Sequence, residues 1–217
     1  ECQFPMVCST YNPKMIEMEK KKQQICILGS TGSIGTQALD VIRQHSDRYE
    51  VYCLTANNSV EKLVQQAREF KPAAVVIGNE AHYETLQELL RDEPDIKVYA
   101  GKEALEQIVS AEPIDMVLAS MVGFSGLVPT INAIKAHKKI CLANKETLVV
   151  AGELICSLAK ENHVPILPVD SEHSAIFQSI VGDADNEITK ILLTCSGGPF
   201  RKFSHEQLKT VTAADAL

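Results

Sequence analysis

Three glycines spaced three residues apart, Gly29, Gly32 and Gly35, form the clearest pattern that could do chemistry. They follow the apolar run 25–28 and precede a segment with helical periodicity. In dinucleotide-binding turns the first glycine permits the tight turn, the second lets the backbone approach a pyrophosphate, and the third allows close packing of helix on sheet. The amides at the helix start then favour an anion. The pattern predicts a dinucleotide site; the alternative is a purely structural turn.

The segment after the second apolar run favours one nicotinamide cofactor over the other. NAD-binding proteins usually carry a carboxylate here for the ribose 2′-OH, whereas residues 54–59 contain no acid. A 2′-phosphate would meet no repulsion, and Asn57, Asn58 and Ser59 can donate hydrogen bonds to it, with Lys62 one turn later. We therefore predict NADPH. These residues also suit a turn and a helix N-cap, and both roles are compatible.

Two later segments also follow apolar runs. Residues 119–123, Ala-Ser-Met-Val-Gly, are small enough to let a flat nicotinamide ring approach, although a plain loop is an equal alternative. Lys145, in the segment 142–146, stands at a helix start, where a cation opposes the helix dipole. Such a placement indicates binding of a substrate oxygen or stabilisation of negative charge in a transition state. The alternative is a surface pair of Lys145 with Glu146.

Asp170 and Glu172 suggest a metal site. Two residues apart, they would face the same way in an extended backbone, and two hard carboxylates suit Mg²⁺ or Mn²⁺. Two carboxylates do not complete such a site, so substrate oxygens, waters or another residue must supply the rest. The alternative is an acidic helix start. For the neighbouring His173 a structural role is favoured.

The segment 194–201 contains Ser196 followed by Gly197 and Gly198. A hydroxyl and backbone amides after a strand suit a phosphate or an oxyanion, although a simple turn explains the same residues. Cys195 has no adjacent base in the sequence, which disfavours a nucleophilic role.

Alternating elements must position these residues. Apolar runs predict strands at 25–28, 51–55, 74–77, 97–99, 116–119, 139–142, 165–169 and 188–194. Helical periodicity predicts helices at 34–45, 60–70, 81–90, 102–110, 127–136 and 147–162. Strands alternating with helices indicate β-α-β units and a mainly parallel, doubly wound sheet of the Rossmann type. Residues 1–23 lack any sustained period and are expected to form a flexible extension.

Composition narrows the class of protein. The 217 residues include 45% apolar and 23% charged residues, with a net charge of −7. These are values of a globular protein, and the acidic balance argues against nonspecific binding to nucleic acid or anionic membranes. No apolar run approaches the roughly 20 residues that span a bilayer. The seven cysteines are odd in number and form no C-x-x-C pair. Three of them, Cys26, Cys53 and Cys141, lie in apolar runs that predict strands. A reducing, cytoplasmic compartment with buried thiols is expected.

Taken together, the segments resemble the 1-deoxy-D-xylulose 5-phosphate reductoisomerase family. The resemblance rests on five stretches in the family's order: 29–35 (GSTGSIG), 142–146 (LANKE), 168–173 (PVDSEH), 175–178 (AIFQ) and 196–200 (SGGPF). It covers residues from about 24 to 217, and the combination is far more specific than the glycine loop alone.

The resemblance implies a Rossmann-type NADPH domain at 24–170 and, at 171–217, the start of an α+β catalytic domain. It implies rearrangement of the phosphorylated keto-sugar 1-deoxy-D-xylulose 5-phosphate and reduction by NADPH to 2-C-methyl-D-erythritol 4-phosphate, in non-mevalonate isoprenoid biosynthesis, with a divalent metal holding two substrate oxygens. A homodimer is expected for the full-length parent.

The resemblance also assigns residues. The cofactor set is Thr31, Gly32, Ser33, Ile34, Ala56, Asn57, Asn58, Ser59, Ser120, Met121, Val122, Asn144 and Glu146. The metal set is Asp170 and Glu172, two of three carboxylate ligands. Lys145, Ser171 and Glu172 are the catalytic set, and Lys145, Ser171 and Ser196 bind substrate.

Some features depart from the family. The glycine and lysine common at the 2′-phosphate turn are replaced by Asn57 and Asn58, and Cys195 stands where many members have Gly or Ala. The family's later segments, including the third metal carboxylate, have no counterpart here, so an N-terminal fragment, inactive by itself, is expected. Two other functions are retained: an NADP-dependent semialdehyde dehydrogenase, which would need an activated cysteine, and a non-catalytic NADP-sensing protein.

Overall fold

The structure, a computed structural model, describes residues 21–182, 187–193 and 198–216. The chain divides between Leu167 and Pro168 into two compact units. Each unit is described below by itself. The sequence placed a domain boundary between 170 and 171, and that assignment of domains stays a prediction.

A seven-stranded sheet forms the centre of the first unit, in the order β4-β3-β2-β1-β5-β6-β7. Every strand pair with a defined register is parallel. The strands are β1 (Gln23–Leu28), β2 (Tyr49–Ala56), β3 (Ala74–Ile77), β4 (Lys97–Ala100), β5 (Met116–Ala119), β6 (Lys139–Leu142) and β7 (Ile166–Pro168). Because the order reverses between β1 and β5, ligands are expected outside the carboxyl ends of these two strands.

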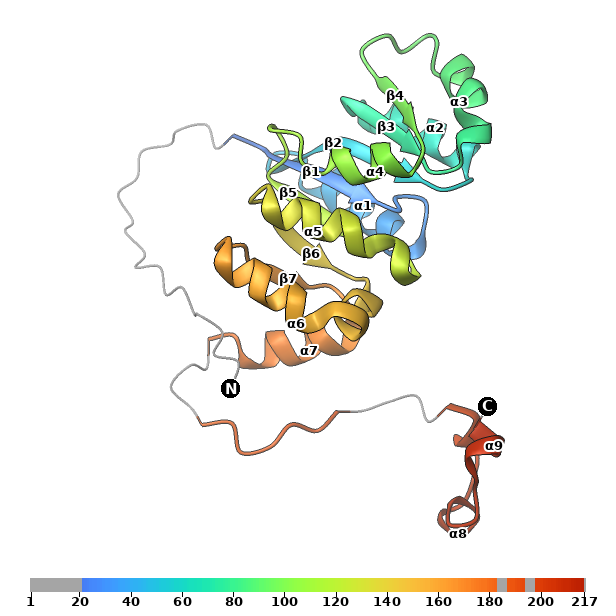
Figure 1. The fold of residues 1–217 in the computed structure, drawn as a ribbon, viewed down its shortest axis with the longest axis vertical. Helices are drawn as coiled ribbons and strands as arrows, with labels where there is room; N and C mark the ends of the chain where they lie inside the picture. Colours follow the sequence, from blue (N-terminus) through green and yellow to red (C-terminus); the bar gives the residue numbers. More distant parts are fainter. Residues whose placement is uncertain (1–20, 183–186, 194–197, 217) are drawn as a thin grey trace. The chain divides into compact units, whose positions relative to one another are not determined.

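Helices cover both faces of this sheet, which confirms the Rossmann-type, doubly wound prediction. One face packs on α4 (Lys102–Ile108), α5 (Leu127–Lys135) and α6 (Lys145–Glu161), which lie in front of the sheet in Figure 1. Cys26 and Leu28 of β1 belong to this core, so the alternating Ile25 and Ile27 face the other side. That side buries apolar residues of α1 (Ser33–Gln44), α2 (Val60–Phe70) and α3 (Tyr83–Leu89).

Cysteine side chains fill part of the core. Cys26 and Cys53 are neighbours in the β1–β2 register and both are fully buried. Burial raises the pKa of the Cys53 thiol, and the neighbouring Cys26 adds to the shift. Burial also raises the pKa of Cys141 to about 11. Cys156 is exposed. The Cys53 and Cys141 thiols therefore stay protonated at neutral pH. Buried thiols such as those of Cys26 and Cys53 pack as small apolar side chains.

Most expected elements agree with those observed. Strand β3 and helix α2 match residue for residue, and the helix expected at 81–90 is split into a short 3₁₀ turn, η1 (Glu80–His82), and α3. The strand expected at 188–194 is wrong for its described residues 188–193, which form no regular structure. Their apolar side chains are largely exposed, for example Leu192 at 76%. A strand needs a partner edge for its backbone groups, and no such pairing exists among the described residues.

The second unit contains short helices in its described part. These are α7 (Ser171–Ile180), the 3₁₀ turn η3 (Gly198–Phe200), α8 (His205–Leu208) and α9 (Ala213–Ala216). Ser204 and Gln207 form a reciprocal capping box on α8. Within the described ranges of both units, no helix has the length and apolar character needed to cross a membrane. The extension expected at 1–23 lies outside the described residues as far as residue 20.

Candidate functional site

The glycine loop between β1 and α1 has two glycines that the fold itself requires. Gly29 has φ +82°, a conformation that side chains rarely adopt, and a Cβ there would lie 3.1 Å from the Ser120 carbonyl oxygen. A Cβ on Gly35 would lie 2.5 Å from the Cα of Ser30. Gly32 differs, because its Cβ would meet only the Gly29 carbonyl oxygen, at 3.3 Å. The protein fold alone therefore does not explain a glycine at position 32.

The start of α1 is suited to an anion. Its N-cap is Gly32, no side chain caps the helix, and its first turn contains no acidic residue. The first amides of a helix have no partner within the helix, and the helix dipole adds partial positive charge. Thr31 and Ser33 are partly or fully exposed beside these amides. This end of α1 can accept a phosphate without rearrangement.

Three side chains from β2 and α2 hold the glycine loop in place. The Thr55 hydroxyl accepts a hydrogen bond from the Gly29 N–H at 2.9 Å. Lys62 Nζ donates to the Thr31 carbonyl at 2.7 Å. Gln66 Nε2 donates to the Ser30 carbonyl at 3.0 Å, and its Oε1 lies 2.7 Å from the Ser30 hydroxyl. The sequence analysis missed Thr55 and Gln66. The only available signal was a glutamine among the apolar residues on the inward face of α2.

The turn proposed for the 2′-phosphate follows β2 directly. Ala56 is buried as the last residue of β2, while Asn57, Asn58 and Ser59 are exposed. Ser59 occupies the N-cap of α2 but makes no side-chain capping bond. Asn79 ties the turn to the end of β3, because its N–H donates to the Asn57 carbonyl at 3.0 Å and its Nδ2 donates to Asn58 Oδ1 at 2.9 Å. No carboxylate lies within the turn itself.

The loop after β5 meets the glycine loop at the centre of the sheet. Both the N–H and the hydroxyl of Ser120 donate to the Leu28 carbonyl, at 3.1 and 2.6 Å. Met121 is partly buried and Val122 is 85% exposed. Since β5, β1 and β2 are parallel neighbours, the loops that follow them gather at one edge of the sheet. The predicted cofactor residues of these three loops therefore come together.

Asn144 is a structural residue of this edge. It is 2% exposed, and its Nδ2 donates to the carbonyls of Met121 and Gly123. Its Oδ1 accepts from the N–H of Thr147 at 2.9 Å, as the N-cap of α6, and from the Thr147 hydroxyl. All of its hydrogen-bonding capacity is thus used within the protein. Lys145 and Glu146 begin α6 and are exposed.

Asp170 and Glu172 lie at the start of α7, within the second unit. Asp170 is the N-cap and Glu172 is in the first turn, so the extended backbone assumed for this pair is wrong. Proline at 168 and the polar Asp-Ser-Glu sequence favour a helix start here. The Asp170 side chain is 12% exposed and lies 3.5 Å from His173 Nδ1. Ser171 and Glu172 are exposed. Across the described ranges, no three His, Cys, Asp or Glu side chains cluster as a metal site.

Ser196 and Cys195 lie outside the described residues. Only the following turn, η3, is described, and Phe200 in it packs edge-to-face on Phe203 at 5.3 Å between ring centres.

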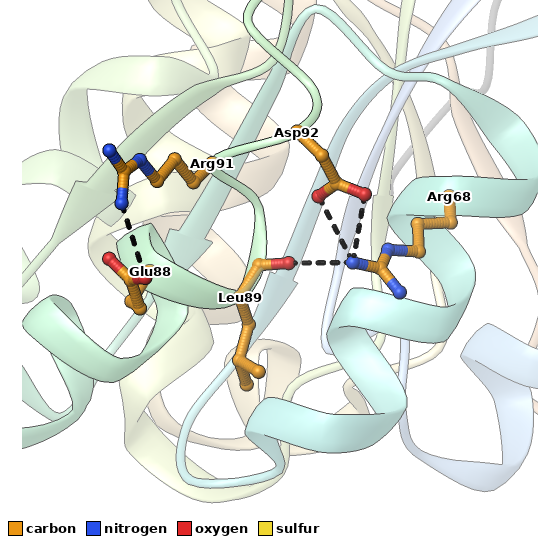
Figure 2. A pocket seen from close by; sticks show the side chains of 5 residues that line it. All are labelled: Arg68, Glu88, Leu89, Arg91 and Asp92. Atoms are coloured by element: carbon orange, nitrogen blue, oxygen red, sulfur yellow. Dashed lines mark hydrogen bonds and ion pairs between the residues drawn. The ribbon is translucent and has the colours of Figure 1, made fainter.

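A shallow hollow of about 570 Å³ lies away from these loops (Figure 2). Its two arginines are already paired. Arg68 Nη2 donates to Asp92 at 3.0 Å and to the Leu89 carbonyl at 2.9 Å, and Arg91 lies 3.7 Å from Glu88. Arg68 is in the last turn of α2 and Leu89 ends α3, so the hollow is at the amino edge of the sheet. Parallel sheets bind ligands at the other edge, and this hollow is not a candidate site.

Comparison with known proteins gives consistent matches. Residues 25–152 match the family described as 1-deoxy-D-xylulose 5-phosphate reductoisomerase, and residues 166–217 match the C-terminal domain of the same family. A 1-deoxy-D-xylulose 5-phosphate reductoisomerase from Phocaeicola vulgatus is 66% identical over 196 residues, which are 90% of this chain and 50% of the relative. That from Bacteroides thetaiotaomicron is 64% identical over 201 residues, or 93% and 51%. The chain spans about half the length of these curated relatives.

Solved structures agree. The 1-deoxy-D-xylulose 5-phosphate reductoisomerase of Zymomonas mobilis in complex with NADPH is 38% identical with a TM-score of 0.79, covering 88% of this chain and 50% of that one. A reductoisomerase in complex with NADPH, fosmidomycin and magnesium is 39% identical with a TM-score of 0.76, covering 89% and 50%. With most of its length matched to one family, the chain belongs to the 1-deoxy-D-xylulose 5-phosphate reductoisomerase family.

Proposed function

We propose that this chain supplies the NADPH-binding domain and the first metal ligands of an enzyme that converts 1-deoxy-D-xylulose 5-phosphate into 2-C-methyl-D-erythritol 4-phosphate. The observation that carries the proposal is the uncapped start of α1 beside an acid-free turn, in a chain of this family. The first feature favours a pyrophosphate and the second favours a 2′-phosphate over a 2′-hydroxyl.

The cofactor contacts follow from this arrangement. The residues proposed for the pyrophosphate are Thr31, Gly32, Ser33 and Ile34, at the start of α1. Those for the 2′-phosphate side are Ala56, Asn57, Asn58 and Ser59. Ser120, Met121 and Val122 would lie beside the nicotinamide. We propose that Asn144 acts indirectly, by holding the loop that contains Met121 and Gly123, while the exposed Glu146 remains a candidate for direct contact.

We propose metal ligands at the start of α7 and, separately, a substrate contact from the start of α6. Asp170 and Glu172 are hard oxygen donors of the kind that Mg²⁺ or Mn²⁺ prefers. The Asp170 side chain is only 12% exposed, and the residue occupies the N-cap position of α7. A bound divalent ion would supply Lewis-acid polarisation of the substrate carbonyl. Lys145 would hold a substrate oxygen, and Ser171 and Ser196 would bind the substrate and its phosphate. Bound NADPH would supply the hydride for the reduction step.

The proposal extends to the setting of the enzyme. The acidic net charge of −7 supports a small-molecule partner rather than nucleic acid or an anionic membrane surface. The buried thiols support a reducing compartment such as the cytoplasm. A homodimer of the whole protein is carried over from the family.

Calorimetry with NADPH and NADH tests the cofactor assignment. We expect tighter binding of NADPH, and Ser59→Asp should shift the preference toward NADH because the new carboxylate would repel the 2′-phosphate. Ser59 makes no capping bond, so this change leaves the start of α2 intact. Equal affinities, or a preference for NADH in the unaltered chain, would contradict the assignment.

The two other functions require different outcomes. A semialdehyde dehydrogenase would lose its activity when Cys195 is alkylated, whereas a metal-dependent reductoisomerase would lose it on removal of the divalent ion. An NADP-sensing protein would bind the nucleotide but show no metal-dependent turnover in any longer form.

A further inference from the structure

Gln66 is a buried polar side chain that none of the proposed cofactor contacts includes. It lies in the middle of α2 and is 7% exposed, on the face that also buries Leu63 and Ala67. A buried amide needs partners for its donor and its acceptor atoms. Both partners of Gln66 belong to a single residue, Ser30, which is in the glycine loop.

The two contacts fix both the backbone and the side chain of Ser30. Gln66 Nε2 donates to the Ser30 carbonyl at 3.0 Å, and Gln66 Oε1 lies 2.7 Å from the Ser30 hydroxyl. That hydroxyl also lies 3.1 Å from the Thr55 carbonyl. Since it has one hydrogen to donate, the shorter contact favours Gln66 as its acceptor. Thr31 and Gly32, which lead into the uncapped start of α1, come directly after this anchored residue.

Helix α2 also begins at the turn proposed for the 2′-phosphate. Ser59 is its N-cap, and Lys62, one turn before Gln66, reaches the same loop through the Thr31 carbonyl. One helix therefore connects the turn at one end of the cofactor site with the loop at the other. Of its two links to the loop, Gln66 is buried and Lys62 is exposed, so Gln66 is the link that water does not compete for.

We infer that Gln66 is a positioning residue for NADPH, which holds the glycine loop in the conformation that binds the pyrophosphate. The inference rests on the proposed function. Gln66 touches no cofactor atom in this scheme and acts through Ser30. Its loss would leave the Ser30 carbonyl without its donor and free the loop to shift, at a cost in affinity for the part of the nucleotide that the loop contacts.

The test compares Gln66→Met with Gln65→Met. Methionine has nearly the shape of glutamine without its amide, and Gln65 is the exposed neighbour on the same helix. Fluorescence titration should show NADPH binding about tenfold weaker in the Gln66 variant. Adenosine 2′-monophosphate, which has no pyrophosphate, should bind within about twofold of the unaltered chain. The Gln65 variant should bind both as before.

A second measurement separates positioning from general loss of stability. Without nucleotide, hydrogen exchange of the Gly29, Ser30 and Gly32 amides should be faster in Gln66→Met, while exchange across the central strands stays unchanged. Ser30→Ala combined with Gln66→Met should be no worse for NADPH than Gln66→Met alone, since Gln66→Met already removes the preferred acceptor of the Ser30 hydroxyl.

The outcomes are distinguishable. NADPH affinity within twofold of the unaltered chain, or equal weakening of both nucleotides, would overturn the inference. If the unaltered chain binds no NADPH, the proposed function fails instead, and the exchange rates of the loop amides still decide whether Gln66 holds the loop.

Discussion

Among single residues, Asn144 links two loops at the edge where the cofactor is proposed to bind. Its amide joins the segment after β5 to the start of α6, and it is almost completely buried. Sequence reasoning assigned this residue to the cofactor directly. Its side-chain polar atoms are all paired within the protein, so we propose that it acts on the cofactor indirectly. Its influence on the cofactor would come from holding Met121 and Gly123.

Asn144→Ala should therefore destabilise the chain by about 2 kcal/mol or more. It removes the side-chain N-cap of α6 and leaves the partly buried carbonyls of Met121 and Gly123 without this donor. Chemical unfolding followed by circular dichroism measures the change. Glu153→Ala, at an exposed position on the same helix, should shift stability by no more than about 0.5 kcal/mol. A loss of NADPH affinity with unchanged stability would instead support direct contact by Asn144.

Among elements, the turn from β1 to α1 contains glycines with two different reasons to be glycine. At Gly35 the helix lies so close to the loop that a Cβ would overlap the backbone of Ser30. At Gly32 an added Cβ would meet only the Gly29 carbonyl oxygen, at 3.3 Å, and a shift of a few tenths of an ångström would relieve that contact. The first requirement belongs to the fold. The second is what we expect if the proposed pyrophosphate approaches the backbone at this residue.

Substitution by alanine should separate the two. Gly35→Ala should lower stability by roughly 3 kcal/mol, because the backbone it meets cannot move aside. Gly32→Ala should stay folded with nearly unchanged stability and bind NADPH about tenfold more weakly or worse. Thermal unfolding and nucleotide titration of both variants are the measurements. Normal NADPH binding by Gly32→Ala would show that the pyrophosphate does not approach this residue.

The same turn shows how far sequence reasoning reaches at this scale. Runs of apolar residues bounded by glycine or proline, as around Ala74–Ile77, define strands because burial on both faces leaves no other choice. The glycine pattern likewise located the turn and the helix start. Local patterns failed at residues 188–193, where an apolar run alone did not provide a strand partner.

The roles of single side chains in the candidate site were harder to predict from the sequence, because they depend on contacts between distant segments. A glutamine on the apolar face of α2 has no meaning until the glycine loop is folded against it, and the use of Asn144 depends on a loop more than 20 residues earlier. For Asp170 and Glu172, the assumption of an extended backbone was wrong because α7 already begins at Ser171, the residue between them. Contacts between distant segments decide such roles.

For the whole molecule, the division after Leu167 separates the proposed cofactor residues from the proposed metal ligands. We therefore expect substitutions of Asp170 and Glu172 to lower the rate of the reaction without changing the affinity for NADPH. This can be tested in a hybrid in which the second half of the Phocaeicola vulgatus relative follows Leu217. Asp170→Asn or Glu172→Gln should lower its metal-dependent turnover roughly 100-fold or more, with NADPH affinity within about twofold. Near-normal turnover in steady-state kinetics would show that the two carboxylates only favour the start of the helix and do not bind the metal.

The order of the strands also has a consequence for biosynthesis. Strand β1 lies in the interior of the sheet, between β2 and β5. Its last residue, Leu28, accepts a hydrogen bond from the hydroxyl of Ser120, which is 92 residues further along the chain. While the ribosome makes the chain, β1 to β4 can pair with one another, yet one edge of β1 stays open until β5 has emerged. An unpaired apolar edge is prone to association with other chains. Nascent chains in which β4 but not yet β5 has left the ribosome should therefore be the ones that chaperones bind most strongly, which capture of chaperones on chains stalled at successive lengths would measure.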